Sequence, residues 1–179
     1  SWLGRDFEQT LSNLKEWCEK LPETPAATWT VDQINTPEAN MLYVDVTCKA
    51  SDIGMMLGQS YGAIGQVMGK QKLAQAGPVF AIYHKYSVDT VIFQACIPVT
   101  KAGKDDGMVK ASKFAAAKAV KVDYYGDYPG TEQAHYYIDD WTKKNNITII
   151  GSPWEEYVTD PMVEKDTSKW LTRIYYPVQ

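Results

Sequence analysis

The chain has 179 residues, of which 45% are hydrophobic and 22% charged. This is enough for one well-packed domain with an appendage, and it is unlike the composition of a disordered chain. No apolar run reaches the roughly 18 residues that a membrane span needs. The formal net charge of -4 argues against direct binding of nucleic acid by this chain, because such a surface needs clustered positive charge. Three cysteines, Cys18, Cys48 and Cys96, are far apart and odd in number, which is typical of reduced thiols in a cytoplasmic protein.

Residues 1–22 carry an amphipathic helical pattern in which apolar residues recur at helical spacing among charged ones. We expect a helix here, followed by a linker over residues 23–39, which are rich in Pro, Thr, Ala and Asn. A single helix with an apolar stripe needs a surface to pack on, and that surface belongs to this domain, to a partner protein or to an upstream domain. The stripe consists of Phe7, Leu11, Leu14 and Trp17.

From Asn40 onward the chain carries one order of elements twice. The first set is a strand at 41–49, a helix from an Asp52 N-cap to about Lys72, and then two further strands. Five glycines recur along this helix, and we interpret them as a packing face, because a phosphate loop lies between a strand and a helix. The two strands are expected at 79–86 and 90–99, and the glycines are Gly54, Gly58, Gly62, Gly65 and Gly69.

The second set begins at residues 108–125. A run of alanines there favours helix, whereas the alternation of Val120 and Val122 favours strand, and we expect a strand. Pro129 suits the first turn of a helix that ends near Asn145. The set closes with strands at residues 153–158 and 170–178.

A seven-residue pattern occurs in both sets: Gly, two residues, an aromatic, two residues, Tyr. The copies are residues 77–83 and 151–157. Two βαββ units of this kind predict an α+β fold in which the units meet about a pseudo-two-fold axis and leave a central ligand groove. The copies differ where Ala81 stands against Glu155, and this carboxylate is the first candidate for function.

Three stretches carry a resemblance to a known family. They are the turn Gly126-Asp127-Tyr128, the run from Pro153 to Pro161 with its Glu-x-Tyr-x-x-Asp-Pro string, and the end from Ile174 to Val178. Together with the βαββ order they resemble the GyrI-like small-molecule-binding domain, which is also the effector-binding module of BmrR-type transcription activators. The resemblance covers residues 40–179, and it implies that Glu155 occupies the position of the family's ligand-contacting acid.

The start of the chain resembles a second family. The stretches from Leu3 to Glu8 and from Leu11 to Lys15 are similar to the C-terminal helix of START-like ligand-binding domains. In some proteins such a domain precedes a GyrI-like domain. The resemblance implies that residues 1–22 are the remnant of an upstream domain.

Strand alternation places Glu155 and Tyr157 on one face and Trp154 on the other. We expect the first two to face the groove, beside Tyr83, and Trp154 to pack beneath a helix. Other candidate lining residues are Tyr61, Tyr125, Tyr128 and Trp170. The alternative is that Glu155 is exposed and that Glu156 is the buried partner of a lysine.

Other chemistries have little support in the sequence. His84 and His135 lie on different elements with no cysteine at metal-ligand spacing, so no metal site is expected. The sequence also shows no phosphate loop and no Ser-His-Asp triad. We therefore expect no cofactor.

The sequence leaves more than one function open. A carboxylate among aromatic rings suits a hydrophobic, cationic or amphipathic small molecule, which the chain would sense or sequester. The alternative is a hydrolase of small strained electrophiles, with Glu155 as general base and Tyr157 or Tyr83 steadying the oxyanion. A third possibility, an inhibitor that binds another protein, has no exposed motif to support it.

Overall fold

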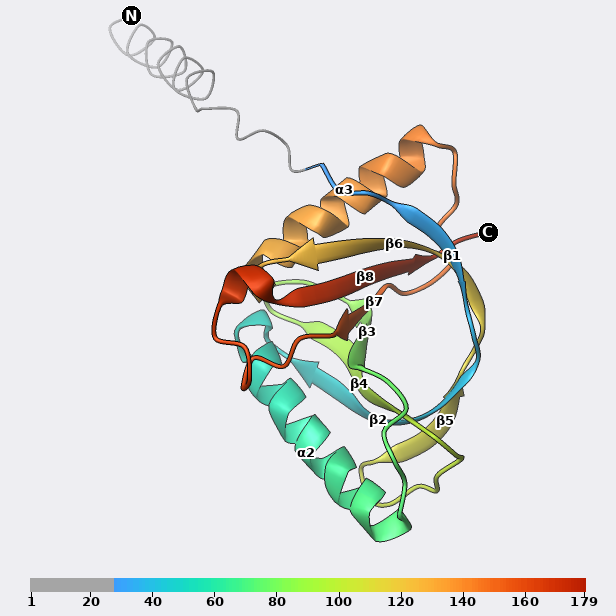
Figure 1. Cartoon of the computed structure of the whole chain (residues 1–179), viewed down its shortest axis with the longest axis vertical. Helices are drawn as coiled ribbons and strands as arrows, with labels where there is room; N and C mark the ends of the chain where they lie inside the picture. Colours follow the sequence, from blue (N-terminus) through green and yellow to red (C-terminus); the bar gives the residue numbers. More distant parts are fainter. Residues whose placement is uncertain (1–27) are drawn as a thin grey trace, which may run out of the picture.

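The computed structural model describes residues 28–179 as one antiparallel sheet of eight strands with two α-helices on one of its faces (Figure 1). The strand order across the sheet is β1-β6-β8-β7-β3-β4-β2-β5. The helices are α2 (Ile53–Gln71) and α3 (Thr131–Lys144). The strands are β1 (Asp32–Thr36), β2 (Ala39–Cys48), β3 (Val79–Lys85), β4 (Val91–Val99), β5 (Lys110–Phe114), β6 (Ala117–Tyr125), β7 (Trp154–Tyr157) and β8 (Leu171–Pro177).

Both predicted sets of elements are present in order, as β2-α2-β3-β4 and β6-α3-β7-β8. The α+β class is therefore confirmed. Antiparallel pairing of β3 with β7 joins the two sets in the middle of the sheet. The pseudo-two-fold axis between them stays a prediction.

Strand β1 lies inside the segment that the sequence predicted as a linker, so that part of the prediction is wrong. β1 pairs antiparallel with β6 at one edge of the sheet, with Ile34 opposite Ala119. Its polar side chains remain largely exposed, and a strand held mainly by backbone hydrogen bonds leaves little pattern in the sequence. The helix predicted over residues 1–22 lies outside the described residues.

The strand predicted over residues 108–125 is two strands, β5 and β6, which separate at Ala115 and Ala116. β5 pairs with β2, and β6 pairs with β1 and β8, so the two strands lie in different parts of the sheet. Thr36 links β1 to β6: its hydroxyl donates to the Ala117 carbonyl at 3.1 Å and accepts from the Ala117 amide at 3.2 Å. The sheet is curled into a half-barrel (Figure 1).

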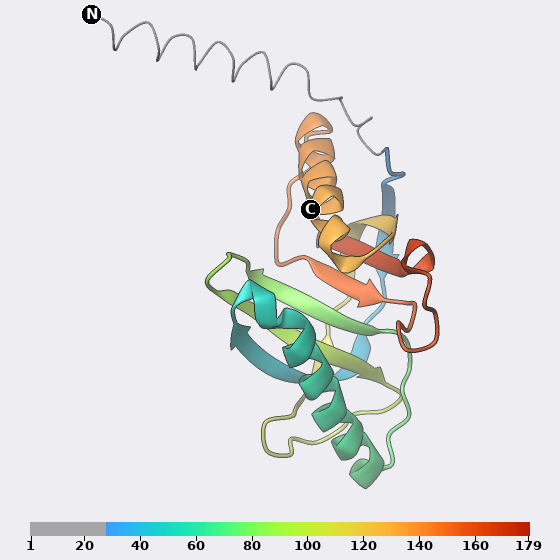
Figure 2. The same ribbon diagram turned by 90° about the vertical axis from the view of Figure 1, so that its left-hand side faces the viewer.

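Each helix covers its own half of one sheet face. Ile64 of α2 belongs to the same buried cluster as Phe93 of β4, and Ile138 of α3 to the same cluster as Ile174 of β8. Strands β7 and β3 form the strip of sheet between the two helices (Figure 2). Neither helix, nor any other in residues 28–179, is long and apolar enough to cross a membrane.

A third core lies on the face of the sheet opposite to the helices, and Trp154 is at its centre. The Trp154 ring stacks on Tyr175 at a centroid distance of 5.0 Å and meets Phe114 edge-on at 5.1 Å. Phe80, its counterpart in the repeated pattern, belongs to the same cluster. The prediction that Trp154 packs beneath a helix is therefore wrong, because the curled sheet builds a core on this face without a helix.

The five glycines of α2 are exposed, and the side of the helix that packs on the sheet contains Ile64 and Val67 instead. A Cβ atom built at any of the five meets no atom within 4 Å. The interpretation of these glycines as a packing face is wrong for the described part of the chain. They are Gly54, Gly58, Gly62, Gly65 and Gly69.

We expect Gly62→Ala to raise the free energy of unfolding by about 0.5–1 kcal/mol, because alanine restricts the unfolded chain and its methyl group has open space. Urea denaturation of both proteins measures the change. The matched control is Gly126→Ala, which destabilises the protein because φ is 152° and the new Cβ would lie 2.4 Å from the Tyr124 hydroxyl. A lower stability of Gly62→Ala would show that a contact on this side of α2 requires glycine.

Candidate functional site

The pairing of β3 with β7 positions the carboxylate predicted as functional. Glu155 lies directly opposite Ala81, and Tyr157 opposite Val79. Ala81 belongs to the buried cluster under α2, so Glu155 points to the same face as the helices.

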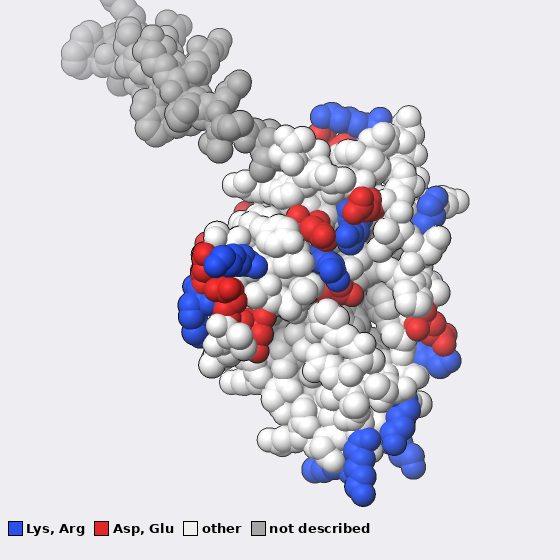
Figure 3. Space-filling view, in the orientation of Figure 1, with Lys and Arg blue, Asp and Glu red and all other residues white. Residues whose placement is uncertain are grey.

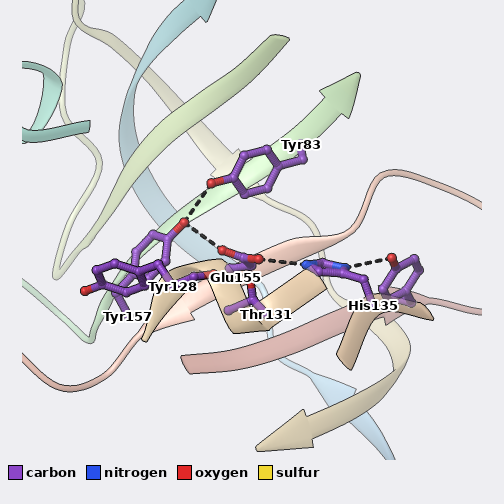
Figure 4. Close-up of polar contacts among 7 residues, drawn as sticks. Tyr83, Tyr128, Thr131, His135, Glu155 and Tyr157 are labelled. Atoms are coloured by element: carbon purple, nitrogen blue, oxygen red, sulfur yellow. Dashed lines mark hydrogen bonds and ion pairs between the residues drawn. The ribbon is translucent and has the colours of Figure 1, made fainter. Parts of the chain in front are cut away.

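Glu155 is buried, with 6% of its surface exposed. The Tyr157 hydroxyl donates a hydrogen bond to Glu155 Oε2 at 2.9 Å. Nε2 of His135, on α3, lies 2.7 Å from Glu155 Oε1. Each carboxylate oxygen therefore has one hydrogen-bond partner, and the two partners come from different elements (Figure 4).

Hydrogen bonds continue on both sides of Glu155. The Tyr83 hydroxyl lies 2.8 Å from that of Tyr157, and the Tyr176 hydroxyl lies 2.8 Å from His135 Nδ1. A carboxylate accepts only, so His135 Nε2 carries a proton and donates. Tyr157 uses its single proton on Glu155, so Tyr83 donates to Tyr157. Five side chains thus form one continuous chain of hydrogen bonds (Figure 4).

Aromatic rings cover one side of this network. Tyr128, in the short 3-10 turn before α3, meets Tyr157 edge-on at a centroid distance of 5.6 Å and lies 5.1 Å from Trp170. On the α2 side the Tyr61 hydroxyl donates to the Phe80 carbonyl at 3.0 Å. Tyr83 also contacts the ring of the exposed Tyr86 at 6.5 Å. The carboxylate therefore lies among rings contributed by both halves of the sheet.

The tyrosines of the network stay protonated well into the alkaline range. Loss of solvent on burial raises the pKa of Tyr157 far above its ordinary value, and the negative charge of Glu155 raises it further. The same two causes raise the pKa of Tyr83. Burial, with the charges of Asp139 and Glu155, raises the pKa of Tyr176 to about 12. At neutral pH these hydroxyls are donors and not bases.

Glu155 forms no ion pair with a lysine or arginine of residues 28–179; its one charge-capable partner is His135. Glu156 faces the other side of the sheet, where it accepts from the Tyr175 hydroxyl at 2.8 Å and lies 3.7 Å from Arg173. The alternative of an exposed Glu155 with a lysine-paired Glu156 is therefore wrong. Adjacent carboxylates on one strand have different environments because strand side chains alternate.

Most of the aromatic residues predicted to line the site do lie near it. Tyr157 and Tyr83 join the network, Tyr61 belongs to the cluster that contains both, and Trp170 contacts Tyr128. Tyr125 does not: it is 61% exposed. Its neighbour Tyr124 packs in the cluster under α3, so alternation turns Tyr125 to the opposite face of the sheet. The prediction of Tyr125 as a lining residue is wrong for this reason.

Sequence reasoning missed His135 and Tyr176 as partners of the carboxylate. The sequence does place His135 on the same side of its helix as the apolar Ile138. A histidine on a buried helix face needs a hydrogen-bond partner, so this position could have predicted a polar partner on the sheet. Thr172 was also missed. It lies opposite Tyr157 on β8, and its hydroxyl is buried without a hydrogen-bond partner among the described residues.

A surface hollow of about 530 Å³ lies at the end of α2. Its two carboxylates are paired at the surface, Asp106 with Lys70 at 3.1 Å and Asp105 with Lys110 at 3.5 Å, whereas its lysines Lys101 and Lys104 form no ion pair among the described residues. Within residues 28–179 no three His, Cys, Asp or Glu side chains are arranged to hold a metal ion. The lining residues of the hollow are Gln71, Leu73, Lys101, Ala102, Lys104, Asp105 and Asp106.

Residues 30–179 match the model of the GyrI-like small molecule binding domain. The chain therefore belongs to the GyrI-like family. The match starts before residue 40, where the sequence predicted the domain to begin, and includes β1. No curated protein sequence matches the chain.

Solved structures share this fold. EcmrR in a complex with DNA has a TM-score of 0.78 and 23% identity, covering 98% of this chain and 66% of its own. This chain thus spans about two thirds of that EcmrR chain. The isolated EcmrR C-terminal domain has a TM-score of 0.77 and 24% identity, covering 86% of this chain and 99% of its own.

Two more distant structures have the same fold. SAV2435 bound to tetraphenylphosphonium has a TM-score of 0.60 and 12% identity, covering 86% of this chain and 94% of its own. A hydrolase encoded by lin2189 from Listeria innocua has a TM-score of 0.62 and 15% identity, covering 90% of this chain and 97% of its own. At these identities the similarity concerns the fold alone.

The raised pKa values of the buried tyrosines give stability a definite pH dependence. A tyrosine whose pKa is raised by folding stabilises the folded state fully at pH values below its unfolded-state pKa of about 10. This stabilisation is lost as the pH rises from there toward the folded-state pKa. We expect the free energy of unfolding to fall above about pH 10, because the unfolded chain releases protons that Tyr83 and Tyr157 keep when folded. Urea denaturation between about pH 8 and about pH 11 measures this. In Tyr83→Phe the fall becomes shallower by about 1.4 kcal/mol per pH unit; an equally steep fall would contradict the assignment.

Proposed function

We propose that the chain binds a lipophilic organic cation beside Glu155. The observation that carries this proposal is a buried carboxylate with no lysine or arginine partner in residues 28–179. A buried charge is costly unless it is paired. A cationic ligand would supply the missing permanent counter-charge.

The surrounding rings support a hydrophobic ligand. Tyr128, Tyr157 and Trp170 contact one another beside the carboxylate, and aromatic faces attract cations as well as excluding water. Tyr157 and His135 use only part of the hydrogen-bonding capacity of Glu155, since a carboxylate has about four acceptor sites. Thr172, next to Tyr157, adds a buried hydroxyl that has no hydrogen-bond partner within residues 28–179 and that a ligand or a water molecule could bond.

The biological role that fits is effector sensing or sequestration in a bacterial-type regulatory system, with multidrug-like breadth of ligands. EcmrR, whose C-terminal domain has this fold, is seen in a complex with DNA. In this chain the net charge is -4, and positive and negative side chains are intermixed over the sheet on the face in Figure 3. In such a system, contact with DNA would come from an upstream domain or a partner.

Calorimetric titration with tetraphenylphosphonium tests the proposal. SAV2435 binds this cation on the same fold. We expect Glu155→Gln to weaken binding at least about tenfold, or about 1.4 kcal/mol, because the amide removes the charge while keeping the shape. The matched control is Glu156→Gln, the adjacent carboxylate on the opposite face, which should bind like the unmodified protein. Equal affinity of the protein and Glu155→Gln would overturn the role of Glu155.

A second candidate function is the hydrolysis of small strained electrophiles. The observation in its favour is that Tyr157 and Tyr83 stay protonated beside the carboxylate, because their pKa values are raised by burial and by Glu155. Glu155 could then take a proton from an attacking water while a tyrosine hydroxyl stabilises the developing oxyanion.

Turnover of cyclopropane-type electrophiles, followed by mass spectrometry of the products, tests the hydrolase. A hydrolase would form a hydrated product at a rate that falls at least about a hundredfold in Glu155→Gln, the usual size of a general-base contribution. The Glu156→Gln control would retain the rate. Binding of tetraphenylphosphonium without any Glu155-dependent product identifies the chain as a binder only.

A further inference from the structure

We propose that a positively charged His135 competes with organic cations for Glu155, so that the site binds a cation more tightly when His135 is neutral. The inference rests on the proposed function, because it concerns the same carboxylate. It assigns His135 the role of a residue that makes ligand affinity depend on pH.

The geometry makes His135 the resident partner of the carboxylate. Its Nε2 lies 2.7 Å from Glu155 Oε1, and 22% of its side chain is exposed. The other ring nitrogen lies 2.8 Å from the Tyr176 hydroxyl. A hydroxyl can donate to the neutral ring or accept from the charged one, so His135 can change its charge without losing either contact.

The groups around His135 leave Glu155 as its main electrostatic partner. On its own helix, Glu132 accepts from the Tyr136 hydroxyl and Asp139 pairs with Lys143. The elements packed against α3 present tyrosines, which are neutral at physiological pH. These are Tyr157 from β7, Tyr176 from β8, Tyr124 from β6 and Tyr128 from the turn before α3.

One carboxylate cannot fully compensate two cations. When His135 is charged, an organic cation at Glu155 meets a positive ring at hydrogen-bond distance from the same group, and the Coulomb terms oppose each other. When His135 is neutral, the charge of the Glu155 carboxylate can compensate the charge of the organic cation. Linkage then requires that the cation lowers the proton affinity of His135 by the same factor as the proton lowers cation affinity.

The test is calorimetric titration of the full chain with tetraphenylphosphonium between about pH 5.5 and about pH 7.5, the range in which histidine ordinarily titrates. We expect affinity to rise about tenfold across this range, and proton release on binding to be visible as a dependence of the heat on the buffer. In His135→Gln, which keeps a hydrogen-bond donor but cannot titrate, affinity should change less than about twofold.

The chain offers a matched control because it has only two histidines. His84 pairs with Ser152 and makes no described contact with Glu155, so His84→Gln should keep the full pH dependence. Binding that depends on Glu155 but not on pH, or a pH dependence that persists in His135→Gln, overturns this inference alone. Absence of Glu155-dependent binding at every pH overturns the proposed function and this inference together.

A measurement without ligand checks the pairing itself. In proton NMR near pH 5.5, the Nε2 hydrogen of His135 should give a resonance protected from solvent exchange by the carboxylate. The resonance should be lost in Glu155→Gln and kept in Glu156→Gln. If it is equally present in Glu155→Gln, His135 is not held by the charge of Glu155 and the inference is wrong.

Discussion

The antiparallel pairing of β3 with β7 is the contact on which both the sheet and the site depend. It joins the two halves through backbone hydrogen bonds and sets Ala81 opposite Glu155. Because strand side chains alternate, a shift of one residue in this register would turn Glu155 to the face that Trp154 occupies. The ladder that completes the sheet therefore also places the carboxylate between the two helices.

The environment of Glu155 is built from groups that donate hydrogen bonds without supplying a fixed positive charge. Tyr157 and Tyr83 form one side, and His135 with Tyr176 forms the other. These groups give each carboxylate oxygen a hydrogen-bond partner, but they do not supply a permanent positive charge to balance the carboxylate. An ordinary structural ion pair differs in this respect, because an arginine or lysine neutralises the acid there.

The sequence predicted what local periodicity controls and missed what long-range geometry controls. Alternation on β7 placed Glu155 and Glu156 on opposite faces, and the repeated pattern selected Glu155 as the one facing the groove. The same reasoning put the helices on the face of Trp154, whereas they lie on the face of Glu155. Tyr124, the neighbour of Tyr125, lies in the core. Had this been predicted, strand alternation would have excluded Tyr125 from the residues that line the site. The contact of His135 with Glu155 joins a helix to a strand, and no spacing in the sequence encodes that approach.

The other errors have similar causes. β1 pairs through its backbone at a sheet edge, so its polar side chains resembled a linker. Trp154 lies in a core that exists because the sheet curls and brings Phe114 over it. Curvature of this kind follows from the twist and pairing of all the strands, and a window of a few residues does not contain it.

The two helices that flank the carboxylate differ in stiffness. α2 has five glycines in 19 residues, whereas α3, which carries His135, has none. Each exposed glycine adds backbone entropy to the non-helical state, so the fraying and local opening of α2 cost less free energy than those of α3. The helix that carries His135, the partner of Glu155, is therefore the more rigid of the two. A displacement of α2, which contributes Tyr61, therefore costs less free energy than an equal displacement of α3.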